Sequence, residues 1–128
     1  MARETSQQLT TGEGNPDMTE EKIKVIFRNW CDGEEVVALF PEWPGDFPGG
    51  RECIAYNSIF KYEGGVYRDW VDKTTPAKPV DYRELKEELE EMGLVLEVRE
   101  KATQKMHEKR RLNAMKYTKN HFPMRLVP

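Results

Sequence analysis

The chain of 128 residues has no long hydrophobic run, and it contains only two cysteines and two histidines. No segment approaches the roughly 18 apolar residues that cross a bilayer. Residues 1–21 are polar throughout and lack the apolar core of a secretion signal. Cys31 and Cys53 form no C-x-x-C pair, so we expect no disulfide framework. These absences predict a soluble cytoplasmic protein that makes no contact with a membrane.

Charge is divided unevenly along the chain. The 20 Lys and Arg against 23 Asp and Glu give a net charge of −3, but residues 1–21 carry −4, residues 22–100 carry −6 and residues 101–128 carry +7. Large aliphatic and aromatic residues gather in the middle segment, which is therefore the part expected to bury a core. We predict a disordered N-terminal arm over 1–21, an α+β domain over 22–100 and a basic helical tail over 101–128.

A β-hairpin opens the predicted domain, with strands over Lys22–Trp30 and Glu34–Phe40. The Asp32-Gly33 pair between them suits a type I′ turn, because both positions of that turn need positive φ. The turn sets the pairs across the hairpin: Val25–Phe40, Ile26–Leu39, Phe27–Ala38, Arg28–Val37, Asn29–Val36 and Trp30–Glu35. Because side chains alternate, one face is nearly all apolar and should meet the core, and the other face is mixed.

A second hairpin is expected over Glu52–Lys61 and Val66–Asp72, with the glycine-containing loop 63–65 between the strands. Two registers are open: Phe60 opposite Tyr67, or Ile59 opposite Trp70. The first is favoured because aromatic cross-strand pairs are stabilising.

A helix is predicted from about Val80 to Met92, after the connector 73–80. Its apolar stripe has helical spacing and consists of Tyr82, Leu85, Leu89 and Met92. Pro79 suits the first turn and Gly93 a left-handed cap. Alternating apolar residues over 94–98 then predict a strand. The order β-β-β-β-α-β indicates an α+β fold in which one helix packs on one face of a mostly antiparallel sheet.

The predicted core contains no obvious catalytic group. Both histidines, His107 and His121, lie in the basic tail, so the core offers no fixed imidazole for a nucleophile. No phosphate-binding loop and no metal-ligand spacing occur. Five acids crowd the central helix (Glu84, Glu87, Glu88, Glu90 and Glu91), and their pattern is typical of a solvated face. We expect no enzyme, no cofactor and no metal site; a small hydrolase with buried acids is a minor alternative.

The basic tail is the first candidate binding feature. Residues 101–120 contain no proline or glycine and predict a helix with a thin apolar stripe made of Ala102, Met106, Leu112 and Met115. Its candidate nucleic-acid contacts are Lys105, Lys109, Arg110 and Arg111, since such a face can follow a phosphate backbone. The other interpretation is that the positive charge of the tail interacts with the acidic segment 22–100 of the same chain or with a protein partner. The sequence leaves open whether the helix is core or free.

Aromatic residues are the second candidate binding feature. Trp30, Trp43 and Phe47 lie on the mixed hairpin face and in the Pro- and Gly-rich loop 41–51. Exposed aromatics of this kind anchor protein partners. Alternatively, they form a second small core covered by the loop or by the tail helix.

Two segments carry a resemblance: KVIFRNWCDGEEVVALFPE over 24–42 and LKEELEEMGLVLEVREKATQKMHEKRR over 85–111. They resemble a group of short hypothetical proteins of bacterial genomes, phages and conjugative elements that share a pattern close to KVIFRK-DG-VIALFPE, then a helix, a glycine and LEVR. The resemblance implies a phage or mobile-element setting and supplies no catalytic residue.

The function expected from these observations is binding without turnover. We predict an accessory or inhibitory factor that docks on a host or element-encoded protein, for example a host defence complex. Trp30, Trp43 and Phe47 would anchor that partner, and the basic tail would steer it. The alternative is a nucleic-acid-binding regulator that uses the basic C-terminal helix.

Overall fold

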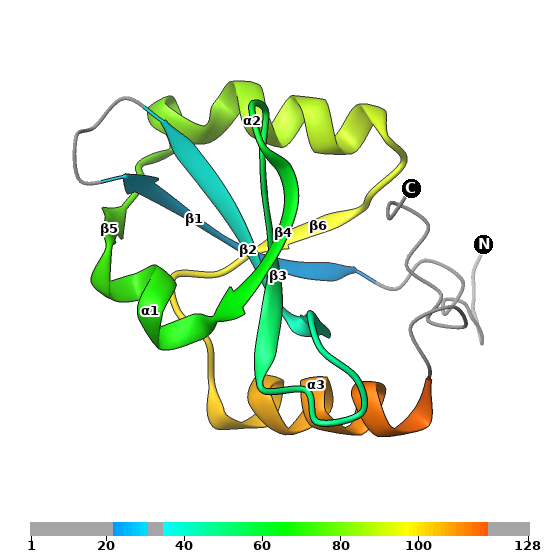
Figure 1. The fold of residues 1–128 in the computed structure, drawn as a ribbon. Coiled ribbons are helices and arrows are strands. Elements are labelled where there is room, and N and C mark those ends of the chain that lie inside the picture. The colour runs from blue at the N-terminus through cyan, green and yellow to red at the C-terminus, as the bar shows by residue number, and fades with distance from the viewer. Residues whose placement is uncertain (1–21, 31–34, 118–128) are drawn as a thin grey trace.

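The computed structural model describes residues 22–30 and 35–117, which form six strands and three helices (Figure 1). In chain order these elements are β1 (Ile23–Trp30), β2 (Val36–Pro44), β3 (Glu52–Asn57), β4 (Lys61–Val66), α1 (Tyr67–Asp72), β5 (Thr74–Pro76), α2 (Pro79–Glu91), β6 (Leu96–Val98) and α3 (Gln104–Lys116). The N-terminal arm predicted over 1–21, the turn at Asp32-Gly33 and the end of the basic tail lie outside the described residues.

The sheet has the strand order β4-β3-β2-β1-β5, with antiparallel pairing along this path. Strand β6 pairs in parallel with the first part of β1, residues 23–25. It lies along the same edge of β1 that pairs with β5 at residues 28–30. The expected α+β class with a mostly antiparallel sheet is confirmed. In the first hairpin, four of the predicted pairs are present: Ile26–Leu39, Phe27–Ala38, Arg28–Val37 and Asn29–Val36.

The second hairpin has neither of the two predicted registers. Strand β4 begins at Lys61, Asn57 lies opposite Lys61, and the connection between β3 and β4 is 58–60 rather than 63–65. The carboxamide of Asn57 builds this connection, because its Oδ1 accepts from the backbone N–H groups of Ile59 at 3.1 Å and Phe60 at 2.6 Å. The turn is therefore stabilised by the side chain of Asn57, whereas the sequence prediction had placed it at the glycines.

Gly64 and Gly65 lie inside β4 because neighbouring groups approach its backbone closely. A Cβ at Gly65 would lie 2.7 Å from Nε1 of Trp70, and a Cβ at Gly64 would lie 3.0 Å from Oε1 of Glu52. A larger residue at either position would crowd these neighbours. The local sequence pattern gives no sign of these contacts.

The predicted strand over Val66–Asp72 is wrong, because Tyr67–Asp72 form helix α1. Its C-terminal end is held by Arg28 of β1, whose Nη2 donates to the carbonyl of Val71 at 3.1 Å and to that of Thr74 at 2.9 Å. These contacts with a distant strand override the β propensity of the segment.

Both faces of the sheet are buried, not only the one that the hairpin pattern favoured. On one face, Phe27 and Phe40 pack with Leu85 and Leu89 of α2. On the other, Ile26, Val37, Leu39, Cys53 and Ala55 pack with Trp70 of α1. The sequence predicted one covering helix, and α1 is a second one that it missed.

Helix α2 agrees with its predicted caps and with most of its predicted stripe. Pro79 stands in the first turn, and Gly93 after the helix has φ +97°. Leu85 and Leu89 are buried, whereas Met92 is 40% exposed and does not belong to the core. Among the described residues, no helix has the length and apolar character needed to cross a membrane.

Candidate binding groove

Helix α3 is attached to the sheet by a buried arginine. Arg110 is 3% exposed; its Nε donates to the carbonyl of Gly50 at 2.8 Å and its Nη1 to the carbonyl of Pro41 at 2.9 Å. These acceptors belong to β2 and to the loop that follows it. Arg110 was predicted to contact nucleic acid; the structure corrects this, because its guanidinium holds the helix in place and is closed to solvent.

The packed face of α3 consists of Met106, Arg110 and Ala114, which are spaced four residues apart. The predicted stripe was wrong in two of its members, since Leu112 is 63% and Met115 71% exposed. The buried face was not recognised in the sequence because its central residue, Arg110, is charged, so the apolar residues alone do not show the four-residue spacing. The side of α3 that remains open to solvent is therefore both apolar and basic.

Docking of α3 depends on glycine at position 50. Gly50 has φ +68°, and a Cβ there would lie 2.9 Å from Cβ of Ala114 and 3.0 Å from Cα of Arg111. Next to this contact, Nδ2 of Asn113 donates to the carbonyl of Glu42 at 3.0 Å. The loop 45–50 and α3 thus pack backbone against backbone.

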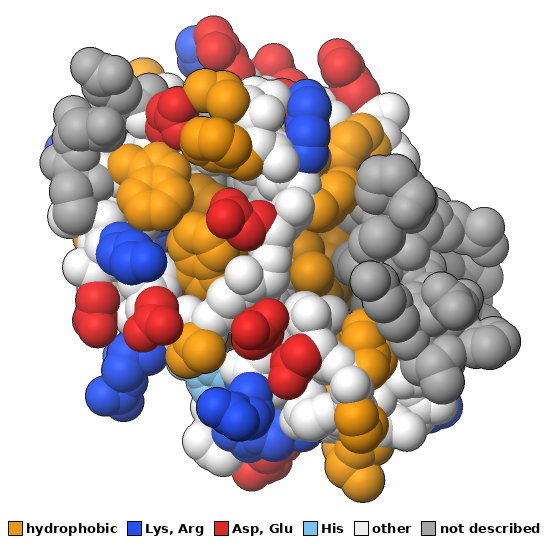
Figure 2. Space-filling view, viewed as in Figure 1, with side chains coloured by type: hydrophobic (Ala, Val, Ile, Leu, Met, Phe, Trp, Pro, Cys, Tyr) orange, Lys and Arg blue, Asp and Glu red, His pale blue; other side chains and the backbone are white. Residues whose placement is uncertain are grey.

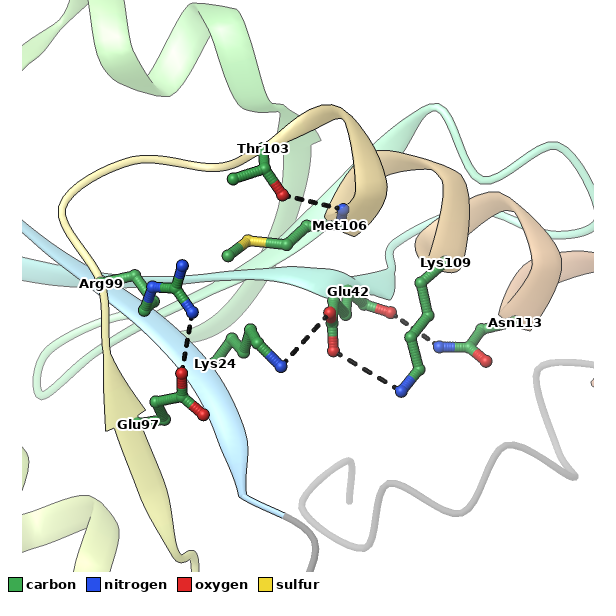
Figure 3. Close-up of polar contacts among 8 residues, drawn as sticks. All are labelled: Lys24, Glu42, Glu97, Arg99, Thr103, Met106, Lys109 and Asn113. Carbon is green, nitrogen blue, oxygen red and sulfur yellow. Dashed lines mark hydrogen bonds and ion pairs between the residues drawn. The ribbon is translucent and has the colours of Figure 1, made fainter.

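A groove of about 1020 Å³ lies between α3 and the neighbouring strands (Figure 3). Its basic lining comes from two elements and one connection: Lys24 of β1, Arg99 after β6, and Lys105, Lys109 and Lys116 of α3. Two acids, Glu42 and Glu108, also line it, which leaves an excess of three positive charges. Met106 and Leu112 supply apolar surface.

Glu42 stands between two lysines in this groove (Figure 3). Its carboxylate lies 3.8 Å from Nζ of Lys24 and 3.9 Å from Nζ of Lys109. Such long, partly exposed ion pairs contribute little to stability. Because positive charge exceeds negative charge in the lining, the groove suits a ligand that carries carboxylates or phosphates next to apolar groups.

Only some of the predicted basic residues meet at this groove. Lys105 and Lys109 line it, Arg110 is buried beneath the helix, and Arg111 is exposed on α3 without lining the groove. Lys24 and Arg99 were not predicted, because they come from other elements: Lys24 lies beside Glu42 of β2, and the parallel pairing of β6 with β1 places Arg99 next to Val25. No local signal reveals that pairing.

The structure does not assemble the three predicted aromatic anchors into one surface. Trp43 stacks on Phe40 with ring centroids 4.3 Å apart and packs against the core beneath α2. Trp30 meets the edge of Trp70 at 5.9 Å and packs on the opposite face of the sheet. Phe47 is half-buried in the loop after β2. Both tryptophans thus contribute to packing, but on opposite faces of the sheet, whereas the alternative interpretation expected one second core under the loop or the tail helix.

Two titratable groups outside the groove, Glu88 and Cys53, have structural roles. Glu88 accepts hydrogen bonds from Oγ of Ser58 at 2.7 Å and from the hydroxyl of Tyr56, and these bonds lower its pKa. Burial raises the pKa of the Cys53 thiol to about 12, so it packs as an uncharged side chain. Within the described ranges, no three side chains of His, Cys, Asp or Glu form a group suited to a metal ion.

His107 makes the docking of α3 sensitive to pH. Nη1 of Arg110 donates to Nδ1 of His107 at 2.7 Å, so the ring must be neutral to accept. Burial and the charges of Arg110 and Arg111 lower the pKa of His107, and the ring of Tyr67 packs against it at 5.1 Å. Because the folded pKa lies below the unfolded value of about 6.5, this contribution to stability is complete above pH 6.5 and decreases as the pH falls further.

We therefore expect the free energy of unfolding to fall between pH 7.5 and pH 5.5, by at most about 1.4 kcal/mol per pH unit from this group. Urea titrations at the two pH values measure the loss. His107→Gln should show a smaller loss, since glutamine can accept a hydrogen bond but cannot be protonated. An equal loss in the variant would show that other groups cause the pH dependence.

No protein-family model matches the chain, and neither a curated protein nor a solved structure does. The resemblance to short proteins of phages and conjugative elements therefore remains a prediction, and function is argued from the groove.

Proposed function

We propose that this chain is a binding protein without catalytic activity, which docks through the α3 groove on an acidic, partly apolar segment of a protein partner. The observation that carries the proposal is the groove of about 1020 Å³ in which five cations surround apolar surface. A partner that brings both carboxylates and hydrophobic side chains would satisfy both parts of this lining.

The resemblance supports a cellular role for this docking. An accessory or inhibitory factor encoded by a phage or mobile element, acting in the cytoplasm on a host or element-encoded protein, is the role we propose. Arg110 supports it indirectly, because fixing α3 on the sheet holds the lysines of the groove in place before the partner arrives, which lowers the entropic cost of binding.

The test is fluorescence anisotropy with a labelled synthetic peptide in which glutamate alternates with leucine, compared with polyglutamate of equal charge. The full chain should bind the mixed peptide more tightly than polyglutamate. The double variant Lys105→Glu/Lys109→Glu should weaken binding by about tenfold or more, because two attractive contacts become repulsive. Arg68→Glu/Arg83→Glu, which reverses two exposed charges on α1 and α2 and so changes the net charge equally, should leave it unchanged. Equal binding by both charge-reversed proteins would contradict the proposal.

Nucleic acid is the second candidate, favoured by Lys105, Arg111 and Lys116, which are exposed on α3. With Arg110 buried, these residues reach about three phosphates, so the logarithm of the affinity for duplex DNA should fall against the logarithm of the salt concentration with a slope near −3. The apolar surface at Leu112 has no counterpart in a phosphate backbone and favours the protein partner. DNA binding with that slope and no binding of the mixed peptide would reverse this preference.

A further inference from the structure

The two longer helices carry opposite charge. In Figure 1, α2 lies at the top, α3 lies at the bottom, and the strands lie between them. Helix α2 has six acidic and two basic residues, a net charge of −4. Helix α3 has five basic residues and one acidic residue, a net charge of +4. The molecule is therefore electrically polar from one end to the other.

The connection between β3 and β4 presents two large apolar side chains at the α2 end. Ile59 and Phe60 are each 63% exposed. Their backbone is fixed, because Oδ1 of the buried Asn57 accepts from both of their N–H groups. Oγ of Ser58 further ties the connection to Glu88 of α2 at 2.7 Å. Turns usually carry small polar residues, so two rigidly held, exposed hydrophobic side chains indicate a contact surface.

A second hollow, of about 270 Å³, lies beside this connection and is acidic. Glu35, Asp81 and Glu84 line it together with Ile59. Figure 2 shows hydrophobic and acidic side chains gathered in the upper part of the molecule, where the β3–β4 hairpin meets α2. We call Ile59, Phe60, Glu35, Asp81 and Glu84 the hairpin tip.

We propose that the hairpin tip of one copy docks in the α3 groove of a second copy, head to tail. This inference rests on the proposed function of the groove and names an occupant for it. The tip supplies the carboxylates and apolar side chains that the cations and Leu112 of the groove require. Because the contact joins two different surfaces, each docked pair leaves one groove and one tip free, so the assembly extends into a filament or closes into a ring.

Sedimentation of the full chain over increasing concentration tests the proposal. Species larger than a dimer should accumulate up to about 1 mM protein, which reaches associations of millimolar Kd, and salt should disperse them. Glu35→Lys/Glu84→Lys should weaken association at least about tenfold, and so should Lys105→Glu/Lys109→Glu. Asp69→Lys/Asp72→Lys and Arg68→Glu/Arg83→Glu, which each reverse two exposed charges on α1 or on α1 and α2, are the matched controls and should associate like the original chain.

Ile59→Ser/Phe60→Ser should weaken association without changing net charge. The decisive arm mixes this tip variant with the groove variant Lys105→Glu/Lys109→Glu. The first keeps an intact groove and the second an intact tip, whereas the mutated tip keeps its carboxylates and is repelled by the mutated groove, so the mixture should form a one-to-one dimer that grows no further. A chain that stays monomeric at every concentration, or a mixture of variants that does not pair, would overturn the proposal.

Failure here and failure of the proposed function give different results. If the chain stays monomeric but its groove still binds the glutamate–leucine peptide, only the head-to-tail contact is wrong. If neither the peptide nor a second copy binds, both proposals are wrong.

Discussion

Replacing Arg110 with alanine is expected to lower the free energy of unfolding by about 3–5 kcal/mol. The change removes the hydrogen bonds to the carbonyls of Pro41 and Gly50 and leaves both of these buried acceptors without their partner. It also leaves a cavity between α3 and β2. Urea unfolding followed by circular dichroism measures the loss.

The neighbouring residue provides the control, because Arg111 has the same side chain but is exposed. Arg111→Ala should change stability by no more than about 0.5 kcal/mol. If Arg110→Ala fails to fold, Arg110→Met offers a milder test, since it keeps most of the side-chain volume and loses only the hydrogen bonds. Equal effects of alanine at positions 110 and 111 would contradict the anchoring role.

Gly50→Ala is expected to cost about 2–4 kcal/mol, through two separate causes. The backbone at Gly50 is left-handed, with φ +68°, and an added Cβ would lie 2.9 Å from Cβ of Ala114 in α3. The methyl group would thus both strain the loop and push the helix away from it. The loss of stability should be accompanied by weaker binding of the glutamate–leucine peptide, because the groove includes α3.

Two other glycines separate these causes. At Gly93, φ is +97° and nothing lies within 4 Å of an added Cβ, so alanine there should cost only the backbone term, about 1–2 kcal/mol. At Gly49 the nearest atom would be Oδ2 of Asp46 at 3.4 Å, an ordinary contact, so alanine should be nearly neutral. Gly50→Ala no more harmful than Gly93→Ala would show that α3 does not press on the loop.

The parts of the fold that follow from neighbouring residues were predictable from sequence. The register predicted for β1 against β2 is present in four pairs, and the spacing of Leu85 and Leu89 marked the buried face of α2. The parts that depend on distant contacts were not. Arg28 of β1 holds the end of helix α1, and Gly65 of β4 leaves space for Trp70. No local sequence pattern indicates either contact.

Of the residues that line the groove, the sequence predicted only two lysines of α3 as binding residues. Lys105 and Lys109 were found because lysines four residues apart share one face of a helix. Arg110 was assigned to the same role because nothing in a run of basic residues indicates that one of them is buried. Its carbonyl partners, Gly50 and Pro41, lie 60 and 69 positions away in the chain. The aromatic anchors were proposed from their number, whereas Trp43 stacks on Phe40 and Trp30 meets the edge of Trp70.

The most direct test of the groove as the docking surface is an amide chemical-shift titration of the isotope-labelled full chain with the glutamate–leucine peptide. The account predicts that the largest shifts fall on Lys24, Lys105, Lys109 and Leu112, and that Lys105→Glu/Lys109→Glu abolishes them. Shifts spread over the surface, or centred away from α3 and β1, would contradict it.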